Sequence, residues 1–166
     1  MFRTVEPKKI KDNLIECIAD EWMLLAAGNS KGYNMMTASW GFMGEMWGED
    51  SVAVVVRPQR YTMEFLDKND YFTISFYGDN KAIHKVCGSS SGRDVDKTKE
   101  TGLTPITNDK YVYFGEARMV LVVKKQFVQP LKEECFIDKE IIDKWYPGKD
   151  YHNLIIGKIE KVLVKE

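Results

Sequence analysis

The spacing of apolar residues changes from a helical to a strand-like period along the first quarter of the chain. Over residues 8–22 the apolar side chains recur every three or four positions, which predicts one amphipathic helix with Pro7 near its first turn. Two short apolar runs follow at 23–28 and 33–39, and four turn-forming residues that include a glycine separate them. This arrangement predicts a β-hairpin.

Runs of β-branched and aromatic residues predict the other strands of the fold. The run at 51–56 carries no charge and is expected to be a buried strand. The glycines at 41, 44 and 48 argue against a regular strand, so an apolar loop is expected over 41–48. Four further strands are expected at 71–77, 111–114, 117–123 and 151–164.

The remaining apolar periodicity predicts short helices. One is expected over 59–68 and another through residue 86, with Asp79 as its N-cap. A third is expected over 137–145, since a Pro-Gly pair follows it. Residues 88–104 are polar and are expected to contain short helical stretches at most.

Short strands outnumber helices in this pattern, and the two do not alternate regularly. The pattern therefore favours a mainly β fold with peripheral helices, a small barrel, over a doubly wound parallel sheet. The 166 residues contain no internal repeat, low-complexity tract or linker. Residues 1–166 are thus expected to form a single domain.

Charge is balanced, with 24 basic and 25 acidic residues and a net charge of −1. This balance provides no overall attraction to nucleic acid or to an anionic membrane, so a ligand must be held by a local site. No apolar run is long enough to cross a bilayer or to act as a secretion signal. The cytoplasm is therefore the expected compartment.

The three cysteines, Cys17, Cys87 and Cys135, are far apart in the sequence and form no CxxC pair. With two histidines in the chain, this pattern argues against a disulfide framework and against a metal site. His84 lies among lysines of a predicted helix and is expected to be exposed and without a role. His152 lies at the start of the last strand, where its ring either points into a site or hydrogen-bonds the backbone.

A first candidate site combines two segments. The strand at 51–56 stops at an Arg-Pro pair and leads into a helix, whose first N–H groups favour an anion. Arg57, Arg60 and Thr62 are suited to grip a phosphate there, although an isolated arginine pair of this kind is more often a solvated surface feature. The small residues of Thr37-Ala38-Ser39 allow a flat ring to lie against the backbone.

A second candidate is the segment 87–97. It lacks the Gly-Lys-Ser/Thr end of a P-loop, the GxGxxG pattern of a dinucleotide-binding turn, and the glycine and glutamate that an EF-hand requires. It is either a flexible loop rich in hydroxyls or a lid that carries Ser89, Arg93 and Lys97 over the same ligand.

Five segments carry a pattern that extends over nearly the whole chain. In order they read Asn34-x-Met36-Thr37-Ala38-Ser39-Trp40-Gly41, Val56-Arg57-Pro58-x-Arg60-Tyr61-Thr62-x-x-Phe65, Phe72-Thr73-x-Ser75-Phe76, Gly88-x-x-Ser91-Gly92-Arg93-Asp94-x-Asp96-Lys97 and His152-x-Leu154-x-Ile156-Gly157-x-Ile159. Together they resemble the flavin-reductase-like, FMN-binding split-barrel family that includes flavoredoxin.

The resemblance implies a six-stranded antiparallel split β-barrel that forms a homodimer, with FMN near the subunit interface. The Arg-Pro-x-Arg-Tyr-Thr segment is the version seen in flavoredoxin-like members, and its charged contacts favour a resident FMN. By the same match, contacts to the ring and ribityl chain are expected from Met36, Thr37, Ala38, Ser39 and Trp40, phosphate contacts from Arg57, Arg60, Tyr61 and Thr62, and outer contacts from Ser89, Ser91, Arg93 and Lys97.

The function implied by the resemblance is that of an oxidoreductase in which FMN accepts a hydride from NADH or NADPH and passes electrons on. His152 is the only histidine expected near the flavin or nicotinamide edge, as an orienting or proton-donating catalytic group. Two alternatives stay open. One is a non-catalytic FMN-binding electron carrier or flavin-storage protein, and the other is a related split barrel that binds another planar cofactor such as haem or deazaflavin.

Overall fold

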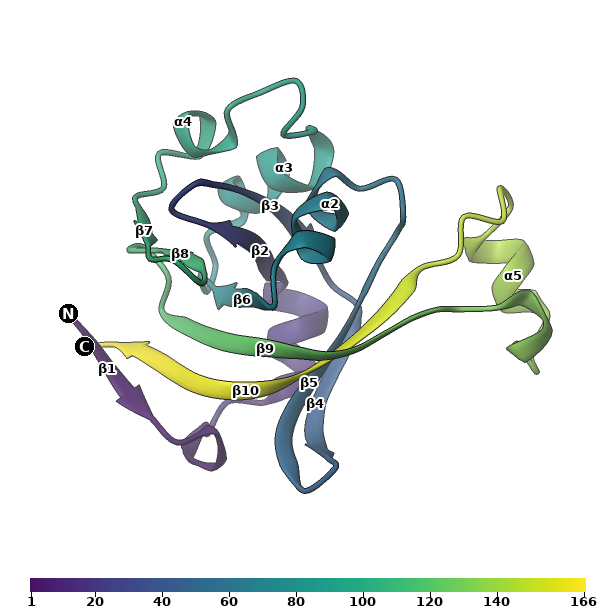
Figure 1. The fold of residues 1–166 in the computed structure, drawn as a ribbon, viewed down its shortest axis with the longest axis horizontal. Coiled ribbons are helices and arrows are strands. Elements are labelled where there is room, and N and C mark those ends of the chain that lie inside the picture. Colours follow the sequence, from purple (N-terminus) through teal and green to yellow (C-terminus); the bar gives the residue numbers. More distant parts are fainter.

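The computed structural model describes residues 1–166 and contains one large antiparallel sheet and one small sheet (Figure 1). The large sheet has eight strands, and the small sheet pairs β7 with β8. The strands are β1 (Phe2–Val5), β2 (Met23–Asn29), β3 (Gly32–Ala38), β4 (Gly41–Met46), β5 (Glu49–Val56), β6 (Tyr71–Phe76), β7 (Pro105–Thr107), β8 (Val112–Phe114), β9 (Met119–Pro130) and β10 (Asn153–Lys165).

Six strands form the wall of a barrel in the order β3-β2-β6-β9-β10-β5. Each neighbouring pair in this wall is antiparallel. The two end strands, β3 and β5, approach each other without pairing, so the barrel is split. Outside the wall, β4 adds to β5 and β1 adds to β10. The expected mainly β, six-stranded antiparallel split barrel is therefore confirmed.

Several strands are buried on both faces, which explains why their sequences are continuous apolar runs. Successive residues of a strand point to opposite faces. In β2, Met23 and Leu25 join the buried cluster inside the barrel, whereas Leu24 and Ala26 join a second cluster on the other face. Because both faces of β2 exclude water, apolar side chains are favoured at both sets of alternate positions.

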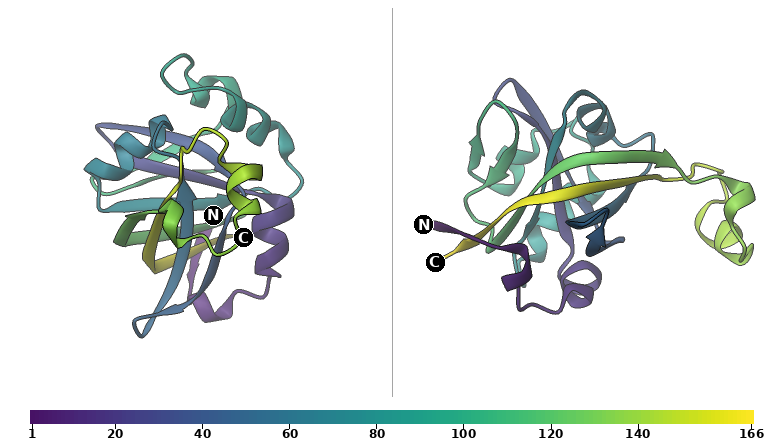
Figure 2. Two further views of the ribbon diagram at one scale, coloured as in Figure 1. Left: turned by 90° about the vertical axis from the view of Figure 1, so that its right-hand side faces the viewer. Right: turned by 60° about the horizontal axis from the view of Figure 1, so that its bottom comes forward.

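The helices lie outside the barrel. Figure 1 shows α2, α3 and α4 gathered on one side, whereas β9 and β10 extend beyond the barrel as a two-stranded arm with α5 at its tip. The right-hand view in Figure 2 shows this arm standing away from the rest of the chain. The helical segments are η1 (Pro7–Lys9), α1 (Leu14–Glu16), η2 (Cys17–Glu21), α2 (Tyr61–Lys68), α3 (Lys81–Ser89), α4 (Lys97–Thr101), η3 (Glu133–Cys135) and α5 (Glu140–Trp145).

The predicted β-hairpin is confirmed as β2 and β3, which pair from Met23 opposite Ala38 to Asn29 opposite Gly32. The expected strands over 51–56 and 71–77 correspond to β5 and β6, and the helix over 59–68 corresponds to α2. Local periodicity therefore identified the elements that surround the candidate site.

The single helix expected over 8–22 is wrong. The chain forms the short 3-10 turn η1, an extended residue at Ile10, and then α1 and the π-helical η2. Asn13 has an extended backbone, and its side chain accepts hydrogen bonds from the N–H groups of Ile15 and Glu16. An N-cap of this kind starts a helix at the next residue and separates it from what precedes it.

The apolar loop expected over 41–48 is also wrong, because β4 pairs with β5 from Gly41 to Met46. A Cβ on Gly41 would lie 2.4 Å from the carbonyl oxygen of Ala53, so glycine permits the close pairing here. Trp47 and Gly48 form the turn with positive φ angles of 57° and 75°. The glycines thus allow the hairpin instead of breaking it.

Three boundaries differ from those expected. Asp79 does not cap the helix after β6, because α3 starts after Asn80 and has no side-chain cap. The strands expected at 111–114 and 117–123 belong to different sheets, since β8 pairs with β7 and β9 with β6 and β10. Finally, β9 runs to Pro130, which lengthens it into the arm.

Candidate functional site

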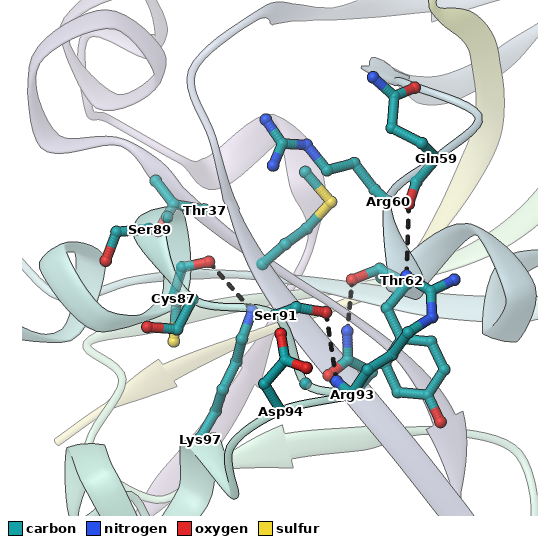
Figure 3. A pocket seen from close by; sticks show the side chains of 16 residues that line it. Thr37, Gln59, Arg60, Thr62, Cys87, Ser89, Ser91, Arg93, Asp94 and Lys97 are labelled. Carbon is teal, nitrogen blue, oxygen red and sulfur yellow. Dashed lines mark hydrogen bonds between the residues drawn. The ribbon is translucent and has the colours of Figure 1, made fainter.

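One polar cavity of about 310 Å³ lies between β3, the start of α2 and the segment that joins α3 to α4 (Figure 3). Helix α3 packs against β3, and α2 contacts both β2 and β3, so β3 joins the helices on either side of the cavity. Nine of the residues predicted for the site line this cavity, namely Met36, Thr37, Arg60, Tyr61, Thr62, Ser89, Ser91, Arg93 and Lys97.

A second cavity of about 200 Å³ adjoins the first, since Met36, Thr37 and Arg60 line both. The remaining predicted residues lie here, at the end of β3, the end of β5 and the start of β10. They are Ala38, Ser39, Trp40, Arg57 and His152, joined by Val55 and Trp145. The two cavities therefore form one groove, which we call the β3 groove, and every predicted site residue lines it.

Arg60 occupies the junction of the two cavities. Its exposed side chain has no ion pair and no side-chain hydrogen bond, and it extends over the pocket in Figure 3. Arg60 is also the N-cap residue of α2 and provides no side-chain cap for that helix. A free guanidinium and an uncapped helix start together favour an anionic group at this point.

Lys97 provides a buried cation at the floor of the polar cavity. Its ammonium donates to the carbonyl oxygens of Met35 at 2.8 Å and Cys87 at 3.1 Å, the second of which Figure 3 marks. Burial lowers the pKa of Lys97 and raises that of the Cys87 thiol to about 11. The amine has a third N–H, and the thiol stays protonated near neutral pH.

The segment between α3 and α4 is held against β3 by a close backbone approach. A Cβ on Gly92 would lie 2.0 Å from Oδ1 of Asn34, so no other residue fits without displacement. The buried Asn34 amide in turn donates to the Thr62 hydroxyl at 2.8 Å. Asn34 was missing from the predicted site, although its position within the β3 motif was the signal for it.

Arg93 closes the polar cavity from the same segment. Its guanidinium lies 4.6 Å from the centre of the Tyr61 ring and pairs with Glu64 at the surface. The hydroxyls nearby already have partners, since Ser91 Oγ accepts from the Arg93 N–H at 3.2 Å and Ser89 Oγ donates to a carbonyl of α3 at 2.6 Å. The second predicted segment thus lines the cavity, and its side chains contact the rest of the chain through Arg93.

Arg57 lines the second cavity, away from this segment. It forms an ion pair with Asp150 at 2.5 Å and donates to the carbonyl oxygen of Trp145 at 2.8 Å. Hydrogen bonds from Gln59 and Arg57 lower the pKa of Asp150. The two arginines three positions apart therefore have different surroundings, one free at the junction and one tied to the arm.

His152 is buried beside the aromatic end of the groove. Its Nδ1 lies 2.8 Å from the Tyr146 hydroxyl, and its ring lies 5.2 Å from that of Trp40. Burial, and secondarily the charge of Arg57, lower the pKa of His152 to about 4, so the imidazole is neutral near pH 7. The ring therefore lines the cavity, which was one of the two expectations. Its hydrogen bond is to a side chain and not to the backbone.

The expected exposure of His84 is wrong. It is 2% exposed, and its Nδ1 lies 3.0 Å from the Thr37 hydroxyl in the β3 groove. Helix α3 buries Ile83, His84 and Cys87 against β3 and leaves its lysines outside. The spacing of those three positions was the available signal, and the lysine neighbours concealed it.

The β3 groove combines two chemical environments. One end has cations, an uncapped helix start and hydroxyls, which suit a phosphate. The other has the small residues Ala38 and Ser39 beside the rings of Trp40, Trp145 and His152, which suit a flat ring. The groove of this split barrel therefore combines an end suited to an anion with an end suited to a flat apolar ring.

The sequence model of the flavin reductase like domain matches residues 15–166. The chain therefore belongs to the flavin reductase-like domain family, as the resemblance predicted.

Solved structures with this fold include three that illustrate its range. Flavoredoxin from Methanosarcina acetivorans has a TM-score of 0.69 at 18% identity, over 98% of this chain and 77% of that chain. Flavoredoxin of Desulfovibrio vulgaris (Miyazaki F) has a TM-score of 0.68 at 23% identity, over 98% and 78%. Nitrilotriacetate monooxygenase component B from Bacillus cereus has a TM-score of 0.67 at 15% identity, over 99% and 82%. The search of curated proteins finds no match.

Proposed function

We propose that the β3 groove holds FMN, with the phosphate in the polar cavity and the isoalloxazine ring along residues 36–40. The observation that carries this proposal is the unpaired Arg60 at the junction of a cationic cavity and an aromatic one. Lys97, Ser89 and Ser91 surround the phosphate in this proposal. Tyr61 and Thr62, the first two residues of α2, line the same cavity. The family assignment and the FMN-binding fold relatives support the same ligand.

The ring end is formed by backbone and small side chains of β3. Ala38 and Ser39 leave room for a flat ring against the strand, and Trp40 and Met36 provide apolar contacts on its sides. Arg57 is tied to the arm, so in this proposal it supports the ring end instead of the phosphate. Residues 1–166 act together as one FMN-binding domain.

The proposed activity is that of an FMN-dependent oxidoreductase that takes a hydride from NADH or NADPH. The flavin supplies the redox chemistry when bound, and the chain binds and orients it. His152 is neutral near pH 7 and hydrogen-bonded to Tyr146, so it serves as an orienting group at the edge of the ring end. A non-catalytic electron carrier is the alternative, supported by the likeness to two flavoredoxins.

One experiment separates these functions. Purified protein is loaded with FMN, made anaerobic, and mixed with NADH or NADPH while flavin absorbance is followed. Bleaching by either nucleotide supports the oxidoreductase. Bound FMN that stays oxidised with both, yet is reduced by dithionite, supports the carrier, whereas a protein that binds no FMN refutes both.

We also propose that the protein is a homodimer in which the arm packs on a second copy. Large apolar side chains are exposed both on the β4–β5 hairpin and on the arm, with Phe42 64%, Trp47 57% and Ile137 fully exposed. Burying such side chains between copies favours association. Because Trp145 of the arm lines the groove, this interface would lie next to the flavin.

The proposed location is the cytoplasm. None of the helices is long and apolar enough to span a bilayer. All three cysteines are free thiols, which suits a reducing compartment. With its balanced charge, the protein is expected to act on small molecules or an electron-accepting protein, without nucleic acid or membrane partners.

A further inference from the structure

Thr37 occupies a central position in the β3 groove, because its side chain lines both cavities. Its hydroxyl has two partners, both from one residue of α3. It donates to the carbonyl oxygen of His84 at 3.3 Å, and it lies 3.0 Å from Nδ1 of the same residue. The contact joins β3 to α3 across 47 positions of the chain.

The His84 ring is enclosed on its other sides. The ring of Trp22 lies 5.8 Å away and that of Tyr77 lies 6.2 Å away, both edge to face. The Nε2 atom is buried and has no hydrogen-bond partner. Burial, and secondarily the charge of Lys81, lower the pKa of His84 to about 4, so the ring carries one proton near pH 7.

The position of that proton follows from the available partners. A proton on Nε2 would be a buried donor without an acceptor, which is among the least tolerated arrangements in a protein interior. A proton on Nδ1 instead donates to the Thr37 oxygen, while the Thr37 proton is given to the His84 carbonyl. Every proton then has an acceptor, and only the lone pair of Nε2 is unused.

We propose that His84 is a positioning residue for the flavin site, which fixes the Thr37 hydroxyl so that it faces the groove as a hydrogen-bond acceptor with no proton to donate. This inference rests on the proposed function. An oxygen oriented in this way accepts from an N–H group of the bound ring and is unfavourable beside a ring carbonyl or unprotonated ring nitrogen. It therefore helps to select how the ring lies on β3.

The tautomer is tested first on the protein without flavin. The ring nitrogens are labelled with ¹⁵N, and the loss of signals in His84→Asn assigns His84, since the chain has two histidines. The expected spectrum at pH 7 shows a protonated Nδ1 and an unprotonated Nε2. A protonated Nε2 would overturn the proposal, whether or not the protein binds FMN.

The coupling to the site is tested by a double-mutant cycle on FMN affinity. His84→Phe and Thr37→Val are each expected to weaken FMN roughly three- to tenfold, the usual effect of one neutral hydrogen bond. If His84 acts through Thr37, the double variant binds as weakly as Thr37→Val alone. Losses that multiply would show that His84 acts otherwise and would refute the proposal.

A conservative variant separates positioning from simple packing. The amide of His84→Asn offers a donor near the place of Nδ1 and should restore FMN affinity and the visible spectrum of the bound flavin, whereas His84→Gln, which reaches toward Nε2, should not. Thermal unfolding without flavin identifies any variant that does not fold. If His84→Phe does not fold, His84→Asn and His84→Gln replace it in the double-mutant cycle. Equal binding by all His84 variants refutes the inference, whereas wild-type protein that binds no FMN refutes the proposed function.

Discussion

Replacement of Arg60 by Ala tests the assignment of the phosphate end most directly. The Arg60 guanidinium lines both cavities and has no partner within the chain, so its loss removes a ligand contact without breaking an internal one. A charge-assisted hydrogen bond contributes about 1.5–3 kcal/mol, which corresponds to a roughly ten- to hundredfold change in affinity. The affinity for FMN should fall by this factor in Arg60→Ala, whereas riboflavin, which has no phosphate, should bind almost as before.

Arg57→Ala is the matched control, because it removes the same charge three positions earlier in the chain. Arg57 forms an ion pair with Asp150 and donates a hydrogen bond to the Trp145 carbonyl oxygen. Of the two cavities, it lines only the one at the ring end. Its loss should therefore weaken FMN and riboflavin to a similar extent. Both variants are compared with wild type by thermal unfolding without ligand, where Arg60→Ala should change little.

The assay is quenching of flavin fluorescence on titration with protein, carried out with both ligands at two salt concentrations. The FMN-selective loss in Arg60→Ala should shrink at high salt, since the contact is exposed and electrostatic. An equal loss of FMN and riboflavin in Arg60→Ala, or an FMN-selective loss confined to Arg57→Ala, would refute the placement of the phosphate.

Three further predictions concern stability and assembly. His84 and His152 have pKa values near 4 in the folded protein, against about 6.5 in the unfolded chain, so the unfolded state binds more protons between these values and stability should rise with pH across that window. Each histidine should account for on the order of 3 kcal/mol of the rise in the free energy of unfolding across that window. This free energy is measured by denaturant unfolding at several pH values from 4 to 7, and it should depend less on pH in His84→Asn; an unchanged pH dependence would contradict the assigned burial. Gly92→Ala should destabilise the protein by about 1–3 kcal/mol, because its Cβ would lie 2.0 Å from Asn34 Oδ1, whereas Gly88→Ala, whose Cβ would meet Thr37 at 3.5 Å, should not; equal melting temperatures would refute the close approach. Ile137→Asp should convert the dimer to a monomer, as measured by light scattering. A monomeric wild type would refute the arm interface.

Much of the fold could be predicted because burial repeats along the strands and helices. The apolar run of β2 and the helical spacing of apolar residues in α2 indicate which faces exclude water. Each pattern can be recognised within a short stretch of the sequence. The prediction was wrong for β4, where glycines were taken as breakers. Whether a glycine breaks a strand depends on what lies opposite, here the Ala53 carbonyl, and that information is not local.

The candidate site was predicted by motif, yet its internal partners were not. All fourteen predicted residues line the β3 groove, but the sequence suggested neither the Asn34 contact to Thr62 nor the pairing of Arg57 with Asp150. Each partner comes from a distant segment, so no spacing rule connects them. The motif specified which side chains are available, and the fold specified which of them are already occupied.

The sequence by itself determined the mainly β class, the hairpin at 23–38, the family and fourteen of the residues that line the groove. Only the tertiary structure decided which arginine is free, that residues 41–46 pair as a strand, and that His84 is buried behind Thr37. The physical reason is the range of the interactions involved. Periodicity and turn chemistry act over a few residues, whereas the partner of a charge or a buried ring is set by how the strands, helices and loops pack, which brings together positions 47 to 93 residues apart.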